Sequence, residues 1–417
     1  MDFKRSKIIK IFGERKYSNS SYWFEIRKNS GFNIYQSKSG KYFIKAYKSI
    51  SLRSEKINKW KSIQPKFRET NMTRTTNMEI DNSAEFKILS VDGGGIKGIY
   101  VAQLFSQIEK KIGNPIGDYF DMIAGTSTGG LIALAITNKV PCDKIVQFYL
   151  EHGPLIFPQG NFLYRWFRNI KQVIISTKYG NTELQKALKG IIPEGNTMDS
   201  ANHILCIPSF NITKGQPRVF KKPFGPYHKD GRCSMLDVGL ATSAAPTYFP
   251  SVQIENDQFV DGGLFANNPS MIAYTEAADH FVNKTHSING EEIKYNGIQL
   301  LSIGLPGDSL GMPTKIKSRH SFFGWKDRLI KSAMTGSEYI ANYQVDKLLN
   351  SMMHSKFYRI IPPKLSTEQL KHITMDNSSK RAISTLLSYG QEVGDIYTST
   401  QWHEINVFFN NPRTFKF

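Results

Sequence analysis

Short apolar runs alternate with helical apolar patterns from residue 86 to the end of the chain. The segments Phe86 to Val91, His203 to Pro208 and Ile298 to Gly304 have the length and the apolar residues of buried strands. After the first of them, apolar residues at helical spacing predict an amphipathic helix: Ile96, Ile99, Val101, Leu104, Phe105, Ile108 and Ile112. Strands that alternate with helices favour an α/β fold with a mostly parallel central sheet flanked by helices.

The C-terminal part of the chain has longer helical patterns. Residues from Ser321 to Leu349 and from Ser366 to Tyr397 are predicted to be largely helical. Together with the strands that precede them, these segments indicate a single large catalytic domain over residues 83–417.

Residues 1–82 have a different pattern and are predicted to form a separate β-rich extension. Three strand-like runs, Tyr22 to Arg27, Phe32 to Gln36 and Lys41 to Tyr47, are separated by polar, glycine-containing turn sequences. This spacing predicts a small β-meander. From Arg68 to Ser83 the sequence is polar and unpatterned, which is typical of a linker.

This extension carries most of the excess positive charge. Residues 1–80 contain 19 Lys and Arg against 6 Asp and Glu, a surplus of 13 out of the chain's formal net charge of +19. Aromatic residues lie among these lysines, and such a mixture suits an anionic lipid surface. We therefore expect peripheral contact with an anionic membrane and no specific binding of nucleic acid. In an equally weighted alternative the aromatic residues pack on the catalytic domain and the lysines only face solvent.

Cysteine content and the N-terminal residues favour a cytoplasmic protein without a bound metal. The three cysteines, Cys142, Cys206 and Cys233, are too scattered for a zinc site and odd in number, which argues against a disulfide framework. Residues Met1 to Lys16 have no continuous apolar core of a signal peptide. The most apolar stretch, Met122 to Val140, is interrupted by glycines, so we expect a buried turn and helix there instead of a membrane span. No cofactor is expected.

A glycine-rich loop follows the first predicted strand. Residues Asp92 to Gly98 read DGGGIKG. The backbone N–H groups of Gly93, Gly94 and Gly95 have no side chain to shield them, and a helix begins just after them, so the loop is suited to bind an oxyanion. The same glycines, with Gly98, also match a dinucleotide-binding pattern in which Asp118 or Asp121 would bind the ribose. The next strand leads directly into a second motif, which disfavours that alternative.

The second motif places a serine on a strand-to-helix turn. Residues Gly125 to Gly130 read GTSTGG, between an apolar stretch and an apolar helical segment. Ser127 is expected to occupy the sharp turn of a nucleophile elbow, and Gly125 and Gly129 leave room for its strained backbone. Together with the oxyanion loop, this motif predicts a serine acyl hydrolase.

A third motif, Asp261-Gly262-Gly263, follows the strand-like residues Gln258 to Val260. The three motifs together resemble the three signatures of the patatin-like phospholipase family, and they occur in the same order along the chain. Further similar stretches are Asp118 to Asp121, Ala241 to Pro246, Asn267 to Pro269 and Leu301 to Gly304. The resemblance covers residues 85 to 400, and differs at Lys97, where many members have arginine.

The resemblance implies a lipid acyl hydrolase that releases fatty acids from phospholipids. It implies a catalytic dyad in which Asp261 accepts the proton of Ser127, with Gly98, Gly262 and Gly263 supporting the site. Some bacterial members are activated by cyclic nucleotides, although no residue of this sequence identifies such a site.

Two alternatives remain open. One is a triad esterase in which a histidine is the base, and His280, His286 and His320 are the candidates. The other is a catalytically silent scaffold that binds lipid or nucleotide, which the intact serine, aspartate and glycine motifs disfavour.

Overall fold

The computed structural model describes residues 23–29, 32–37, 42–46, 83–159, 177–288, 291–307 and 327–413. The chain divides into two compact units, Met1–Glu79 and Ile80–Phe417. The predicted boundary at residue 82 stays a prediction. His320 and most of the predicted linker lie outside the described residues.

The first unit contains three strands, where the sequence pattern indicated them. These are β1 (Trp23–Asn29), β2 (Phe32–Ser37) and β3 (Tyr42–Ala46), and they pair antiparallel in the order β1-β2-β3. The structure does not describe the contacts of the aromatic and lysine side chains on these strands.

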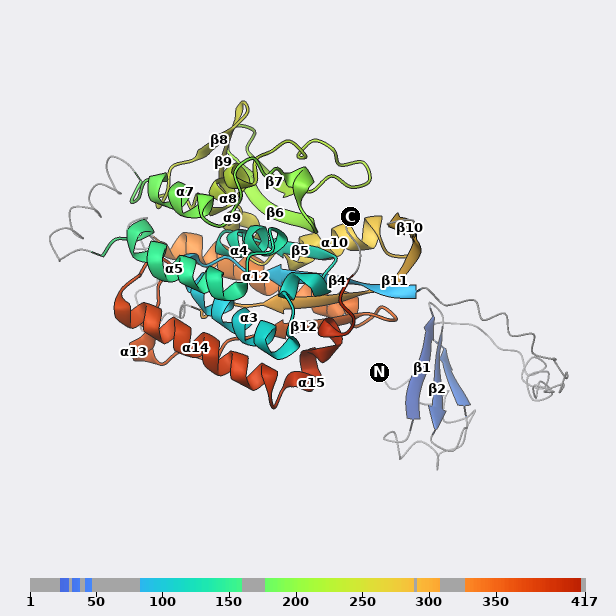
Figure 1. The fold of residues 1–417 in the computed structure, drawn as a ribbon. Helices are drawn as coiled ribbons and strands as arrows, with labels where there is room; N and C mark the ends of the chain where they lie inside the picture. Colours follow the sequence, from blue (N-terminus) through green and yellow to red (C-terminus); the bar gives the residue numbers. More distant parts are fainter. Residues whose placement is uncertain are drawn as a thin grey trace, which may run out of the picture. The chain divides into compact units, whose positions relative to one another are not determined.

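The second unit is built on a nine-stranded sheet (Figure 1). Its strands are β4 (Ser83–Val91), β5 (Met122–Gly125), β6 (Ile204–Asn211), β7 (Gln216–Lys221), β8 (Val252–Ile254), β9 (Asp257–Asp261), β10 (Thr285–Ile288), β11 (Glu291–Ile303) and β12 (Lys356–Ile360). The hydrogen-bonded order is β10-β11-β4-β5-β6-β9-β8, with β12 also paired to β11 and β7 to β6. The central strands, from β12 through β11, β4, β5 and β6, are parallel, and antiparallel strands extend the sheet at both ends. The predicted α/β class is confirmed.

Helices cover both faces of this sheet. The α-helices are α3 (Gly98–Ile112), α4 (Thr128–Thr137), α5 (Cys142–Ile156), α7 (Thr182–Lys189), α8 (Met235–Ser243), α9 (Gly263–Ala266), α10 (Ser270–His280), α12 (Asp327–Leu349), α13 (Thr367–Leu370), α14 (Lys380–Thr398) and α15 (Trp402–Ile405). Four 3₁₀ turns accompany them: η3 (Gly95–Lys97), η4 (Ile116–Tyr119), η5 (Met198–Ser200) and η6 (Asn406–Phe409). Along β4, Leu89 and Val91 belong to the core cluster that includes α3, α4 and α14, whereas Phe86 and Ile88 belong to the cluster that includes α10 and α12. Alternate residues of one fully buried strand therefore fill two helical layers.

The side of β6 on which each neighbour pairs explains how two distant strands meet. Cys206 pairs with β5 and also with β7, so these two strands lie on opposite sides of β6. Ser209 pairs with β7 and also with Asp261 of β9, so β9 lies on the same side as β5. Since β5 runs parallel to β6 and β9 runs antiparallel, the carboxyl ends of β5 and β9 point toward each other.

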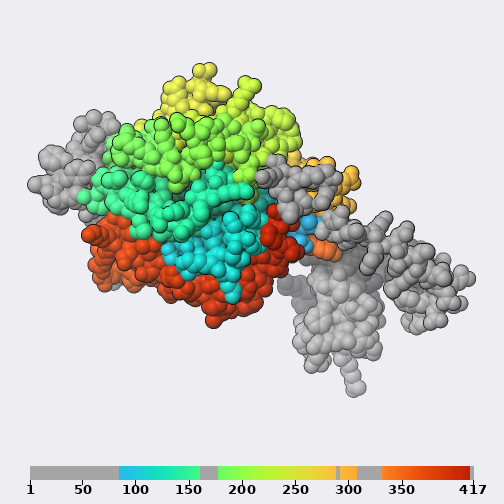
Figure 2. Space-filling model, viewed as in Figure 1, coloured from blue at the N-terminus to red at the C-terminus, as the bar shows by residue number. Residues whose placement is uncertain are grey.

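The C-terminal region is less continuously helical than the pattern predicted. Helices α13 and α14 are separated by residues 371–379, where Ser379 begins α14 by accepting a hydrogen bond from the N–H of Ala382. Helix α14 packs on α3, and in Figure 2 the red C-terminal segment lies beside the cyan one. Gly390 allows this approach, because a Cβ there would lie 2.6 Å from the carbonyl oxygen of Tyr100.

Among the described residues, no helix combines the length and the apolar character that crossing a bilayer requires. The apolar stretch Met122 to Val140 consists of β5, a tight turn and the buried helix α4, as expected.

Candidate active site

Ser127 stands on a strained turn between β5 and α4. Its backbone has φ 54° and ψ −122°, a conformation that a residue with a side chain rarely adopts. Its N–H donates to the hydroxyl of Thr242 at 3.0 Å, and Thr242 in turn donates to the carbonyl of Pro208 at 2.6 Å. These bonds hold the turn against the end of β6. The serine therefore lies at the N-terminus of α4, where the helix dipole favours negative charge.

Two glycines make this turn sterically possible. A Cβ on Gly125 would lie 2.1 Å from the carbonyl oxygen of Gly129, and a Cβ on Gly129 would lie 2.2 Å from that of Val91. A larger residue at Gly125 would push β5 away from the start of α4, and one at Gly129 would push α4 away from the end of β4. The sequence prediction of a glycine-dependent elbow at these positions agrees with this geometry.

The glycine-rich loop lies directly against Ser127. A Cβ on Gly93 would lie 3.3 Å from that of Ser127. However, the N–H of Gly93 donates to the carbonyl of Asn267 at 3.0 Å, and that of Ile96 donates to the carbonyl of Met375 at 2.9 Å. Within the described residues, no hydrogen bond takes the N–H of Gly94 or Gly95.

Asp261 ends β9 and is buried, with 2% of its surface exposed. Its Oδ1 accepts a hydrogen bond from the N–H of Gly263 at 2.7 Å, while Oδ2 is buried without a hydrogen-bond partner among the described residues. Burial raises the pKa of Asp261 to about 6, against the opposing effects of the Gly263 N–H and the Ser127 hydroxyl. The serine is thus close enough to lower this pKa, although no hydrogen bond of regular geometry joins the two side chains.

Two hollows meet beside these residues. The first, called the Ser127 hollow, is walled by apolar side chains that include Leu131, Phe148, Ile156, Phe157, Leu184 and Phe249. The second, called the Asp261 hollow, is lined by Asp261, Leu264, Lys331 and Met334. Ala245, Tyr248 and Met375 line both, so the two hollows adjoin along these residues, with Ser127 in the first and Asp261 in the second.

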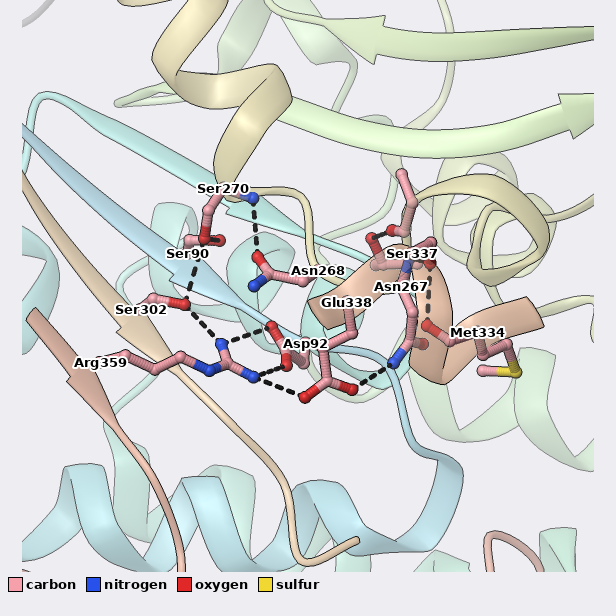
Figure 3. Close-up of polar contacts among 12 residues, drawn as sticks. Ser90, Asp92, Asn267, Asn268, Ser270, Ser302, Met334, Ser337, Glu338 and Arg359 are labelled. Carbon is pink, nitrogen blue, oxygen red and sulfur yellow. Dashed lines mark hydrogen bonds and ion pairs between the residues drawn. The ribbon is translucent and has the colours of Figure 1, made fainter. Parts of the chain in front are cut away.

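A buried polar network holds the two loops that carry the site (Figure 3). The guanidinium of Arg359, from β12, bonds Asp92 at 2.5 Å and Glu338 of α12 at 2.7 Å. It also donates to Ser302 at 2.7 Å. The Asn267 side chain donates to Glu338 at 3.5 Å, and the Asn267 backbone carbonyl accepts from the N–H of the loop glycine Gly93. Helix α12 is thereby connected to both the glycine loop and the segment after Asp261.

The histidines proposed as alternative bases contact other groups. His280 lies against Glu276, Asp279 and the rings of Phe224 and Tyr227. The ring of His286 lies 3.3 Å from the carbonyl of Phe281. Neither lines a hollow beside Ser127.

Other residues that the sequence suggested as ligands bond to groups within the protein or lie apart from one another. The carboxylate of Asp121, one of the possible ribose ligands, is buried and accepts bonds from the N–H of Lys87 and the hydroxyl of Tyr295. The described residues contain no cluster of His, Cys, Asp or Glu that could hold a metal ion, and the three cysteines are free thiols.

Comparison with known proteins agrees with the motifs. The family described as patatin-like phospholipase matches residues 89–274. A cGAMP-activated phospholipase of Vibrio cholerae serotype O1 is 31% identical over 328 residues, which cover 74% of this chain and 90% of that protein. Patatin-like protein 2 of Oryza sativa subsp. indica is 30% identical, over 74% of this chain and 83% of that protein. A cGAMP-activated phospholipase of Escherichia coli strain TW11681 is 26% identical, over 79% and 94%. The chain belongs to the patatin-like phospholipase family, which confirms the predicted family and its class, lipid ester hydrolases.

Three residues at the site were not found by sequence reasoning. Asn267 stands in a stretch whose resemblance to the family was noted, but its bond to the glycine loop was not expected. Arg359 and Met375 lie in unremarkable segments, and only the folded chain brings them to the loop. One local signal could have pointed to Arg359. It is a charged residue within the short strand-like run Lys356 to Ile360, and a charge on a buried strand needs a partner.

Proposed function

We propose that this protein hydrolyses the fatty-acyl esters of phospholipids, with Ser127 as nucleophile and Asp261 as its base. The observation that carries this proposal is the strained serine at the N-terminus of α4, beside a buried carboxylate whose Oδ2 has no other described partner. Both groups adjoin an apolar hollow that suits an acyl chain.

In the first step Ser127 attacks the ester carbonyl carbon while its proton passes to Oδ2 of Asp261. The carbon–oxygen bond to the glycerol then breaks, and the leaving alkoxide takes that proton. Water next attacks the acyl-serine while Asp261 accepts one of its protons. The bond between the acyl carbon and Oγ then breaks, Ser127 takes the proton back from Asp261, and the fatty acid is released. Because burial raises the pKa of Asp261 to about 6, its carboxylate is a stronger base than an exposed aspartate.

The negative oxygen of each tetrahedral intermediate requires hydrogen-bond donors. Gly94 and Gly95 are the best candidates, because the N–H of Gly93 is already donated to Asn267. Gly93 then contributes by its lack of a side chain, which lets the loop approach Ser127. One such donor is typically worth about 3 to 4 kcal/mol of transition-state stabilisation.

Replacement of the nucleophile tests this function. Ser127→Ala should reduce fatty-acid release from phospholipid micelles by about a thousandfold or more. It should also abolish covalent labelling by a fluorophosphonate. Ser351→Ala, which alters an exposed serine at the end of α12, is the matched control and should behave as wild type. Persistent labelling of the Ser127→Ala protein at another residue would contradict the assignment, and a wild-type protein that releases no fatty acid would support the silent scaffold.

Regulation by a cyclic nucleotide is a second part of the proposal. It is supported by the names of two relatives, which describe them as cGAMP-activated phospholipases. We expect cGAMP to increase the rate of phospholipid hydrolysis by this protein at least about tenfold, whereas its linear dinucleotide should not. Equal rates with and without cGAMP would contradict this regulation but leave the hydrolase assignment intact.

A further inference from the structure

The chemistry of the proposed reaction assigns different parts of the substrate to the two hollows. The group that accepts the serine proton must return it to the leaving oxygen, so the leaving alcohol has to lie on the side of Asp261. The acyl chain then extends on the other side of the carbonyl carbon, into the Ser127 hollow. This division follows from the order of proton transfers together with the lining of each hollow.

The two hollows also differ in charge. The described lining of the Ser127 hollow contains no lysine or arginine, whereas Lys331 of α12 lines the Asp261 hollow. Leu264 and Met334 line the same hollow together with Asp261, so the hollow combines one lysine and the Asp261 carboxyl with apolar side chains. Met334 lies one turn along α12 from Lys331 and four residues before Glu338, which bonds Arg359 (Figure 3).

The leaving group of a phosphoglyceride matches the lining of the Asp261 hollow, because it combines a negative charge with apolar carbon chains. When one acyl ester is cleaved, the departing molecule is a lysophospholipid with a phosphodiester of single negative charge and one remaining apolar chain. A lysine ammonium pairs with a phosphate as a point charge, and apolar side chains suit the glycerol carbons and the remaining chain.

We propose that the Asp261 hollow is the subsite for the phosphoglycerol part of the substrate, and that Lys331 binds its phosphate. The proposal rests on the proposed function and extends it, since it makes Lys331 the residue by which the enzyme distinguishes phospholipids from neutral glycerides. Lys331 does not participate in bond making; it orients the leaving group so that its alkoxide oxygen lies near Oδ2 of Asp261.

The test compares two lipids that have the same acyl chains and differ only in the presence of a phosphoglycerol head group. Dioleoyl phosphatidylglycerol and dioleoylglycerol are each diluted in the same nonionic detergent micelles, in the presence of cGAMP. We expect Lys331→Met to lower kcat/KM for the phospholipid at least about tenfold and to change that for dioleoylglycerol less than about twofold. Lys331→Arg should retain most of the phospholipid activity. Lys347→Met, which alters a lysine of the same helix that is 64% exposed, should behave as wild type on both lipids.

A soluble competitor provides a second measurement without a lipid surface. Glycerol 3-phosphate should competitively inhibit the hydrolysis of a short-chain soluble ester by the wild-type protein. Its inhibition constant should rise at least about tenfold in Lys331→Met while KM for the neutral ester stays unchanged.

The results separate this proposal from the function on which it rests. If Lys331→Met lowers the hydrolysis of both lipids equally, or of neither, the phosphate subsite is refuted while the hydrolase assignment stands. If the wild-type protein hydrolyses neither lipid nor the soluble ester, both proposals fail together.

Discussion

At the scale of single residues, the site combines a strained serine with a carboxylate that burial makes more basic. An exposed aspartate with a pKa near 4 is a poor base for a serine hydroxyl. Burial raises the pKa of Asp261 to about 6, and the single N–H donated by Gly263 opposes this only in part. In the proposed mechanism, the apolar surroundings of the hollows therefore increase the basicity of Asp261 as well as binding the acyl chain.

The pH dependence of the reaction follows from this pKa. Because the base must be ionised, kcat/KM for a soluble ester should rise as pH increases through about 6 and reach a plateau above about 7. Asp261→Asn should abolish most of the activity over the whole range, since the amide cannot accept the proton. The measurement is a pH profile of initial rates, with folding checked by circular dichroism.

Histidine variants provide the control for the dyad. His280→Ala should keep both the rate and the profile, because His280 contacts Glu276 and Asp279 and lies outside both hollows. Loss of turnover in a folded His280→Ala or His286→Ala protein would instead support a triad.

At the scale of secondary-structure elements, one arginine connects β12, β4 and α12. Arg359 is 8% exposed, and it faces Asp92, which is 1% exposed, at the start of the glycine loop. Burial raises the pKa of Asp92 to about 7 even though Arg359 acts to lower it. The charge of Asp92 thus depends on this partner, and the position of the glycine loop depends on both.

Removal of that arginine should damage both stability and the loop. Arg359→Met leaves the Asp92 carboxyl buried and unpaired, which typically costs about 3 to 5 kcal/mol of unfolding free energy. The result can be measured by urea denaturation at pH 8. Arg381→Met is the matched control, because Arg381 pairs with Glu368 on the surface and such a pair contributes only about 0 to 1 kcal/mol. Similar losses of unfolding free energy in the two variants would show that the Arg359 network does not stabilise the fold more than a surface ion pair does.

The strand arrangement explains why these elements meet. β9 returns along β6 on the same side as β5, so the residues after the two strands converge from opposite directions. In a wholly parallel sheet the end of β9 would not face the end of β5. The antiparallel addition to the parallel centre is therefore what brings Asp261 to Ser127.

At the scale of the whole molecule, the positive charge is concentrated in a different unit from the site. Residues 1–80 carry a surplus of 13 positive charges, whereas Ser127, Asp261 and the glycine loop belong to the unit Ile80–Phe417. This separation agrees with a peripheral membrane-binding role for the first unit, which stays a proposal. Each suitably placed lysine would contribute about 1 kcal/mol near an anionic bilayer.

Truncation separates the two roles. A chain that begins at Ile80 should bind anionic vesicles more weakly than the full chain, yet hydrolyse a short-chain soluble ester at a similar rate. Binding by the full chain should also weaken with salt, since screening acts over roughly 10 Å at 0.1 M. Sedimentation of vesicles at two salt concentrations and a soluble-ester assay measure both effects. Equal vesicle binding by the two proteins would contradict the anchoring role.

Features that depend on short-range sterics can be predicted from the amino-acid sequence. A Cβ at Gly125 would meet Gly129, four residues along the chain, and a Cβ at Gly129 would meet the adjacent strand β4, so the glycine pattern predicts the tight turn at Ser127. The alternation of apolar runs and helical patterns likewise predicted the α/β class, because each element must bury a face.

The convergence of distant groups at the site follows from the folded chain alone. The convergence of Asp261 on Ser127 depends on strand pairing along β6, and the bond from Gly93 to Asn267 removes one of three predicted oxyanion donors. Arg359 and Met375 reach the glycine loop from C-terminal segments whose local patterns gave no sign of it. Such contacts depend on how whole elements pack. The apolar pattern repeats every two residues in a strand and every 3.6 in a helix, and it does not show on which side of a strand the neighbouring strand pairs.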